Sequence, residues 1–277
     1  MQNLSLYVLS YNSPKQFEYW CEAFAVAYPS VFKQCAKFVI NNSDDPKTQT
    51  AYQRLFATYD FTQIPVYANT GICGGRFLAA QHFDKNSAEY MVFFEDDMLV
   101  RKSSTKLCKA GFRTHHPQLF ETCVEIIKRE QLSFLKLCFS EVLNTNIENK
   151  AFGTLSKIEQ KEFILSKNIG QRTQVSSIEI ISTLPYAIGY FYYCNWPILF
   201  SKAGNRVVFL INIPKFKYES TWTREAYLLQ LNGNLRTACL LASPILHHRK
   251  YSYRPQDRVE NEYGQKIRGV KICRDKN

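Results

Sequence analysis

Short apolar runs alternate with segments of helical periodicity over the N-terminal third of the chain. Leu4–Ser10 is typical of a buried strand, and Ser13 and Pro14 after it are residue types that begin helices. The residues that follow place apolar side chains at positions i, i+3, i+4 and i+7 of one helical face: Phe17, Trp20, Cys21 and Phe24. The pattern therefore predicts a strand followed by a helix.

This strand–helix unit repeats along the next segments. Further strands are predicted over Phe38–Ile40, Ile64–Tyr67 and Met91–Phe94, and helices over Thr50–Tyr59 and from a glycine-rich turn at Asn69–Arg76 through Phe83. Alternation of this kind is typical of an open, mostly parallel sheet flanked by helices. The predicted fold class is therefore α/β.

The rest of the chain alternates less regularly. Residues 144–177 are polar without a sustained apolar face, and we interpret them as an insertion or loop. The elements predicted around them are strands over Phe134–Phe139, Tyr186–Tyr193, Val207–Ile213 and Ala238–Leu241 and a helix over Glu225–Asn232.

Polar residues follow each of the first four predicted strands. Ligands of open α/β sheets bind beyond the carboxyl ends of the strands, where these residues are expected to converge. The four polar clusters are Ser10–Ser13, Asn41–Asp45, Asn69–Arg76 and Glu95–Asp97. Together they predict one binding site at this edge of the sheet.

The last of these clusters consists of three consecutive carboxylates, Glu95, Asp96 and Asp97. Acids at the end of a buried strand repel one another and lose hydration, so another group must offset that cost. A divalent cation such as Mg²⁺ or Mn²⁺ prefers oxygen ligands and usually shares its site with substrate phosphates. The alternative is a strand end whose acids are solvated.

No common nucleotide-binding motif is present. The first turn lacks GxGxxG, and the chain contains no GxxxxGK[ST]. A nucleotide is still expected at the edge of the sheet, with Asp44 or Asp45 near the base and ribose and a metal at Asp97 holding the diphosphate.

The composition is compatible with a large core and an anionic partner. Of the 277 residues, 45% are hydrophobic and 14% aromatic, and the formal net charge is +11. Basic residues gather at Arg101–Arg113 and from His247 to Asn277, and such patches attract nucleic acid, phosphate-rich substrates or an acidic membrane face.

The chain is expected to be a cytoplasmic protein. No apolar run approaches the roughly 18 residues of a membrane helix, and the N-terminus begins directly with a strand-like segment rather than a signal peptide. Nine cysteines without a CxxC pair indicate reduced thiols. The group Cys108, His115, His116 and Cys123 has no common zinc spacing.

Four motifs, in this order, resemble those of GT-A glycosyltransferases, and most closely the family-2-like bacterial enzymes: SYNSP, NNSDD, NTGICGGR and FFEDDM. The resemblance implies a Rossmann-like GT-A fold in a single domain, residues 1–277. Its parts would be a nucleotide-binding half (1–100), an acceptor-side half (101–255) containing the polar insertion, and a basic C-terminal tail (256–277).

The resemblance also implies an activity. The expected reaction is metal-dependent transfer of a sugar from a nucleotide-diphosphate sugar, a UDP-sugar first of all, to a hydroxyl of a glycan or glycolipid. Inversion at the anomeric carbon, Mn²⁺ or Mg²⁺ as cofactor, and a role in bacterial surface polysaccharide or lipopolysaccharide synthesis are expected. The basic patches would support peripheral association with the inner face of the cell membrane.

The resemblance assigns residues to these roles. Asp97 and His247 are expected to bind the metal, and a carboxylate is expected to act as the base. Glu225 is the first choice, because it is predicted to open a helix, and Glu219 is the reserve. Glu95 replaces the first Asp of the family's DxD motif. Donor-binding residues are expected to be Ser10, Tyr11, Asn12, Asn42, Asp44, Asn69, Gly74, Arg76, Glu95, Asp96, His248 and Arg249.

Two other functions remain open. A sugar nucleotidyltransferase of related fold is expected to carry a glycine-rich loop with Arg or Lys directly after the first strand, and SYNSPKQF has no glycine. A non-catalytic nucleic-acid-binding protein would explain the charge, but no binding module is recognisable and the acidic cluster would oppose a phosphate backbone. No nucleic acid is therefore expected as a partner.

Overall fold

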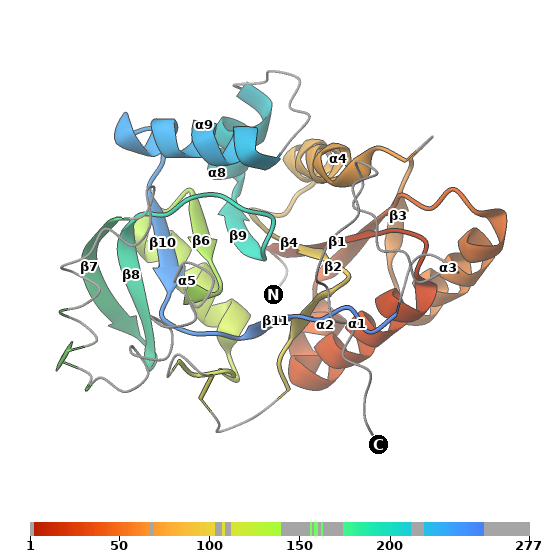
Figure 1. Cartoon of the computed structure of the whole chain (residues 1–277), viewed down its shortest axis with the longest axis horizontal. Helices are drawn as coiled ribbons and strands as arrows, with labels where there is room; N and C mark the ends of the chain where they lie inside the picture. The colour runs from red at the N-terminus through yellow and green to blue at the C-terminus, as the bar shows by residue number, and fades with distance from the viewer. Residues whose placement is uncertain are drawn as a thin grey trace, which may run out of the picture.

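A computed structural model describes residues 3–66, 69–102, 107–108, 112–139, 174–211 and 219–251 and positions 156, 158, 159 and 162. Its centre is a nine-stranded sheet with the order β3-β2-β1-β4-β9-β6-β10-β8-β7 (Figure 1). The strands are β1 (Leu4–Ser10), β2 (Ala36–Asn41), β3 (Thr62–Ile64), β4 (Tyr90–Glu95), β6 (Phe134–Lys136), β7 (Gln174–Ile181), β8 (Leu184–Tyr190), β9 (Ile198–Ser201) and β10 (Thr237–Leu240).

The first four strands of this sheet are parallel, as predicted. β1 lies between β2 and β4, with Ser10 opposite Asn41 and Leu9 opposite Glu95, and β2 pairs with β3. The carboxyl ends of β1, β2 and β4 therefore lie side by side. Beyond β4 the sheet is mixed, because β9 and β8 run antiparallel to their neighbours. The prediction of a mostly parallel α/β sheet is confirmed.

A second, two-stranded sheet brings the end of the described chain back to this edge. β5 (Met98–Val100) follows the acidic cluster and pairs antiparallel with β11 (Ile245–His247). The register places His247 opposite Met98. The pairing thereby holds His247, a residue late in the sequence, opposite the residue that follows Asp97.

Helices cover both faces of the large sheet (Figure 1). One face carries α1 (Pro14–Ala27), α2 (Pro29–Gln34), α3 (Pro46–Tyr59) and α5 (Leu119–Glu130), and the other carries α4 (Gly71–Lys85), α8 (Lys202–Asn205), the π-helix η2 (Arg206–Ile211) and α9 (Glu219–Leu231). No helix in the described part of the chain has the length and apolar character needed to cross a membrane.

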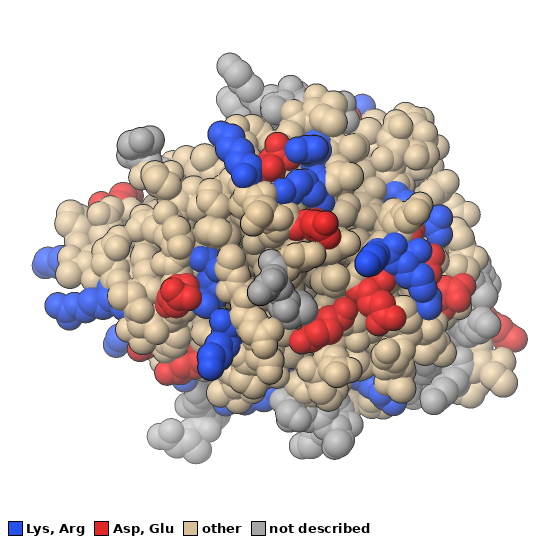
Figure 2. Space-filling model, turned by 180° about the vertical axis from the view of Figure 1, so that it is seen from behind, with Lys and Arg blue, Asp and Glu red and all other residues tan. Residues whose placement is uncertain are grey.

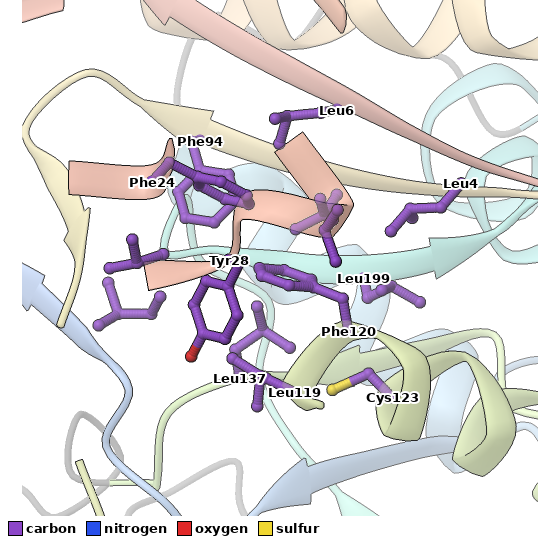
Figure 3. Close-up of a cluster of buried hydrophobic side chains, with 14 of the residues drawn as sticks. Leu4, Leu6, Phe24, Tyr28, Phe94, Leu119, Phe120, Cys123, Leu137 and Leu199 are labelled. Carbon is purple, nitrogen blue, oxygen red and sulfur yellow. The ribbon is translucent and has the colours of Figure 1, made fainter. Parts of the chain in front are cut away.

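The core under α1, α2 and α5 is rich in aromatic rings (Figure 3). The Phe24 ring stacks on Phe120 with centroids 5.2 Å apart and meets Phe94 edge-on at 5.8 Å. Full burial of such a side chain contributes about 1.5–3 kcal/mol each. Cys123 lies in the same cluster, and its burial raises the pKa of the thiol. Cys123 is therefore a core residue.

The predicted strand over Val207–Ile213 is wrong, because Arg206–Ile211 forms the π-helix η2. The Ser201 side chain accepts a hydrogen bond from the Gly204 backbone N–H at 3.1 Å and starts the short helix α8, which η2 continues. A short apolar run such as VVFLI has no periodicity that separates a buried strand from a buried helix.

Other boundaries also differ from the predictions. The helix expected to begin at Glu225 begins at Glu219, and the insertion expected over 144–177 ends before β7, which begins at Gln174. The third strand ends at Ile64, where it was predicted to begin, and Tyr67 lies outside the described residues.

Candidate functional site

The acidic cluster forms a tight turn between β4 and β5. Glu95 ends β4 and is half-buried, and Asp96 and Asp97 fill the turn with exposed fractions of 3% and 4%. The Asp96 backbone N–H donates to the Leu9 carbonyl at 3.1 Å, which ties the turn to the end of β1. Both aspartates are thus buried at the carboxyl edge of the sheet.

The Asp97 carboxylate meets two basic side chains from the C-terminal segment. Arg249 Nη2 lies 2.7 Å and His247 Nε2 3.2 Å from Asp97 Oδ2, and the His248 backbone N–H donates to the Asp97 carbonyl at 2.8 Å. The pairing of β11 with β5 produces this arrangement. The other carboxylate oxygen, Asp97 Oδ1, is buried and has no hydrogen-bond partner within the described structure.

These contacts keep Asp97 ionised. Burial acts to raise the pKa of its carboxyl group, but the hydrogen bonds and charges of His247 and Arg249 outweigh it and lower the pKa below its usual value. The hydrogen bond to Asp97 in turn raises the pKa of His247. The pair therefore favours a carboxylate facing an imidazolium.

Asp96 behaves differently from its neighbour. Burial raises its pKa to about 7, although Arg249 and hydrogen bonds from Ser10 and the Tyr11 backbone lower it in part. The Ser10 hydroxyl lies 2.5 Å from Asp96 Oδ2 and 2.6 Å from the Tyr52 hydroxyl. Two adjacent acids with pKa values displaced in opposite directions are typical of functional sites.

The ends of β1 and β2 are joined by a second polar cluster. Asn12, with a positive φ of 45°, donates its backbone N–H to the Ser43 hydroxyl at 2.8 Å, and its side-chain amide donates to the Asp44 carboxylate at 2.8 Å. Asp44 is exposed. This cluster offers an accessible carboxylate beside the acidic turn.

The start of α4 is tied to the same edge. The Asn42 amide donates to the Gly71 carbonyl at 3.0 Å and its oxygen accepts from the Thr70 hydroxyl at 3.0 Å, while the Asn69 oxygen accepts from the Gly71 N–H at 2.9 Å. Gly71 has φ +67°, a conformation that favours glycine. The predicted convergence of polar clusters on one edge is therefore observed for Ser10, Asn12, Asn42, Asn69 and the acidic turn.

Gly74 and Arg76 lie inside α4, not in the turn that was predicted for Asn69–Arg76. The Arg76 guanidinium is 1% exposed and lies 4.0–5.0 Å from the ring centroids of Phe93, Phe200 and Phe209. Burial lowers its pKa, and Tyr193 partly offsets this effect. Its Nη1 and Nη2 atoms have no hydrogen-bond partner in the described structure.

The two candidate bases lie on α9. Glu225 is half-buried in the second turn, and Glu219 is the first residue of the helix. The prediction that Glu225 opens the helix is therefore wrong. The helix packs through a row of residues at four-residue spacing, Trp222, Ala226 and Gln230.

Two functional-site neighbours escaped the sequence analysis: Gln16 and Tyr52. Gln16 and Tyr52 are fully buried and bind the ends of the strands. Gln16 lies four residues before Trp20 and Tyr52 four before Phe56, so both continue the buried face of their helix. A polar residue on such a face is the signal that could have identified them.

No three His, Cys, Asp or Glu side chains within the described ranges are grouped as a metal site. His115 stacks on Tyr28 with ring centroids 5.5 Å apart, and His116 Nε2 lies 3.1 Å from the Ser182 carbonyl. At the acidic turn, however, the partnerless Asp97 Oδ1 beside His247 suits a cation that a ligand's phosphates also bind. The residues at the acidic turn therefore fit Mg²⁺ or Mn²⁺ when the phosphates of a bound ligand also bind the cation.

The sequence matches no protein-family model and no curated protein. The structure is similar to S. aureus TarS 1-349 in complex with UDP-GlcNAc, at 14% identity and a TM-score of 0.51 over 91% of this chain and 60% of that chain. The TarS 1-349 complex with UDP matches at 16% identity and a TM-score of 0.49, over 88% and 59% of the two chains.

The mannosyltransferase PcManGT from Pyrobaculum calidifontis, in complex with GDP-Man and Mn²⁺, matches at 14% identity and a TM-score of 0.37, over 49% and 35% of the chains. At these identities the likeness to the UDP-GlcNAc complex concerns the fold alone. The chain spans 60% of the length of that TarS chain. The α/β architecture is the GT-A fold that the sequence motifs predicted.

Proposed function

We propose that the protein is a glycosyltransferase that transfers a sugar from a nucleotide-diphosphate donor, with UDP as the nucleotide, to a hydroxyl of a glycan or glycolipid. The observation that carries the proposal is the cluster of Asp97, His247 and Arg249 at the carboxyl end of β4. A GT-A fold similar to a UDP-GlcNAc complex supports it. The ligand of that neighbour supports the choice of UDP over other nucleotides.

In this proposal the diphosphate binds at the acidic turn. Asp97 and His247 would hold Mn²⁺ or Mg²⁺, with His247 losing its proton to the solvent as the metal binds, and the metal would supply positive charge for the departing diphosphate. Arg249 adds donors and positive charge at the same place, and His248 is kept as a proposed donor-binding residue. Asp96 is buried under Ser10 and supports the turn, and Glu95 completes the acidic motif.

The nucleoside end of the donor is assigned to the neighbouring strand ends. The exposed Asp44 carboxylate, held by Asn12, is suited to accept hydrogen bonds from ribose hydroxyls or a base N–H. Asn42 and Asn69 keep the start of α4 in place beside it. Tyr11, Gly74 and Arg76 stay predicted donor-binding residues.

The transfer is proposed to be a single displacement with inversion. The acceptor hydroxyl attacks the anomeric carbon, a new C–O bond forms, and the bond to the diphosphate oxygen breaks with its electron pair on the leaving nucleotide. A carboxylate of α9 takes the hydroxyl proton. Glu219 is now the first choice, because it occupies the helix N-terminus that the argument for Glu225 required.

A cytoplasmic location with peripheral binding to an anionic membrane, where surface polysaccharide or lipopolysaccharide precursors are built, is proposed on charge alone. The face in Figure 2 carries acidic as well as basic side chains, so it supplies no uniformly basic surface. The basic tail 256–277 lies outside the described residues. Binding to anionic vesicles that weakens as salt rises is the expected behaviour.

The test is titration calorimetry of UDP with and without Mn²⁺. The wild-type protein is expected to bind UDP more tightly with Mn²⁺, and Asp97→Ala is expected to lose this dependence. Asp84→Ala is the matched control. Asp84 lies in the last turn of α4, away from the acidic turn, and also pairs with an arginine, Arg206 of η2. Failure of the wild-type protein to bind UDP or a panel of nucleotide sugars would falsify the proposal, and pyrophosphate release from a nucleoside triphosphate and a sugar phosphate would indicate a nucleotidyltransferase.

A further inference from the structure

One buried amide connects the acidic turn to the C-terminal segment. Gln16, the third residue of α1, is fully buried and lies beneath both. Its Nε2 donates to the carbonyls of Asp96 at 2.9 Å and His248 at 3.3 Å. Its Oε1 accepts from the backbone N–H groups of Lys250 at 2.8 Å and Tyr251 at 3.0 Å.

Gln16 thus uses its whole hydrogen-bonding capacity on main-chain groups. A carboxamide offers two N–H donors and one oxygen that can accept two bonds, and all four are engaged here. Neither a carboxylate nor an apolar side chain can bind two carbonyls and two N–H groups at once. The amide is therefore specific to this arrangement.

The bonds fix the strap Leu246–Tyr251, the segment that carries the basic side chains of the site. Pairing with β5 fixes the strap backbone as far as His247. The hydrogen bond from the His248 N–H to the Asp97 carbonyl fixes the next residue. Arg249 comes next and lies between His248 and Lys250, which Gln16 binds from either side. The path of the backbone at Arg249 follows from this pair of contacts.

We propose that Gln16 is a positioning residue for donor binding, which clamps the strap against the Asp96–Asp97 turn and so directs Arg249 and His247 onto Asp97. This inference rests on the proposed function, because the consequence to be measured is binding of the UDP diphosphate. Partners that orient the groups of a metal site typically change affinity by about 10–100-fold when they are removed.

The chain provides a matched control in Gln230 of α9, which is also buried. Its Oε1 accepts from the Phe191 N–H at 2.8 Å and the Thr237 hydroxyl at 2.7 Å, and its Nε2 donates to the Phe191 and Ala226 carbonyls at 3.0 Å. Gln230→Met and Gln16→Met therefore remove the same number of hydrogen bonds from equally buried amides. Only Gln16 contacts the strap and the turn.

The experiment measures thermal unfolding and calorimetric UDP binding in Mn²⁺ for the wild-type protein and both variants. Both variants are expected to unfold at lower temperature. At a temperature where all are folded, Gln16→Met is expected to bind UDP at least about tenfold more weakly, and Gln230→Met within about twofold of the wild-type protein. Equal affinity of Gln16→Met and the wild type, or equal losses in both variants, would overturn the inference.

Two further measurements keep the test decisive. If Gln16→Met does not fold, Gln16→Glu replaces it, because a carboxylate keeps the bonds from Lys250 and Tyr251 and loses those to the carbonyls. In an Arg249→Ala background, Gln16→Met is expected to weaken binding further by less than it does alone, because it acts through Arg249. Full additivity would count against positioning. A wild-type protein that does not bind UDP would refute the proposed function instead.

Discussion

Arg249 and Asp97 are 152 positions apart in the sequence, yet Arg249 Nη2 lies 2.7 Å from Asp97 Oδ2. The pairing of β5 with β11 brings the two residues together. Shortly after this pairing, Gln16 binds the backbone of the same segment at Lys250. The acidic turn is thus completed by a segment from the other end of the described chain. Mutations in either segment should be energetically coupled to mutations in the other.

A double-mutant cycle tests this coupling. Asp97→Asn and Arg249→Ala are each expected to destabilise the protein, because each leaves a buried or half-buried group without its charge-assisted partner. The double variant is expected to lose less than the sum, with a coupling energy of about 1–2 kcal/mol. Urea unfolding without metal measures all four proteins. Additivity within about 0.5 kcal/mol would show that the contact adds no stability.

A second prediction separates the two candidate bases of α9. Glu219→Gln is expected to keep UDP binding and to lose at least roughly 10²-fold in turnover, the usual scale of general-base catalysis. Glu225→Gln is the matched comparison from the next turns of the helix and should lose much less. The assay is sugar transfer to an acceptor from the donor that a screen of UDP-sugars identifies, with the anomeric configuration of the product determined. The reverse order of losses would restore Glu225, and retention of configuration would exclude the single displacement.

The misplaced start of α9 shows where sequence patterns stop being informative. The buried row of this helix contains an alanine and a glutamine besides Trp222, so it carries little apolar periodicity. The strands β1, β2 and β4 were predictable because each is a compact apolar run bounded by polar turn residues. The run Val207–Ile211 has the same composition and forms a helix, since only tertiary packing distinguishes the two.

The candidate site likewise combines features that the sequence predicts with features that it does not. Polar clusters at the ends of parallel strands could be predicted, because the topology brings those ends together. The resemblance predicted His247 at the metal and Arg249 at the donor, but it did not predict that both side chains contact Asp97, and no local pattern indicates the β5–β11 register. Gln16 reaches Lys250 across 234 positions, and a single polar residue on a helix face does not indicate its partner.

A third prediction concerns pH and His82. Burial, with Lys85 nearby, lowers the pKa of His82, whose Nδ1 lies 2.9 Å from the Tyr7 hydroxyl. Below about pH 6.5 the unfolded chain binds a proton at this residue more readily than the folded protein does, so stability falls as pH falls. In His82→Gln the free energy of unfolding should decline less between about pH 7 and pH 5. Urea unfolding at several pH values measures both slopes, and identical slopes would contradict the prediction.

The last prediction concerns Arg76, a buried cation whose described surroundings are aromatic rings. Desolvation of an arginine without a carboxylate partner costs several kcal/mol. Contacts with rings, worth about 2 kcal/mol each when the cation is desolvated, and the interaction with Tyr193 offset this cost. These terms nearly cancel, so Arg76→Met, which keeps the length of the side chain, should change the free energy of unfolding by less than about 1 kcal/mol. Arg76→Ala should cost about 3 kcal/mol or more, because it leaves a cavity between Phe93, Phe200 and Phe209. If Arg76 also serves the donor, as its place in the NTGICGGR motif predicts, Arg76→Met should bind UDP more weakly at unchanged stability. Urea unfolding and calorimetry on the same samples separate the two roles: a large loss of stability with normal UDP affinity would identify Arg76 as a structural residue.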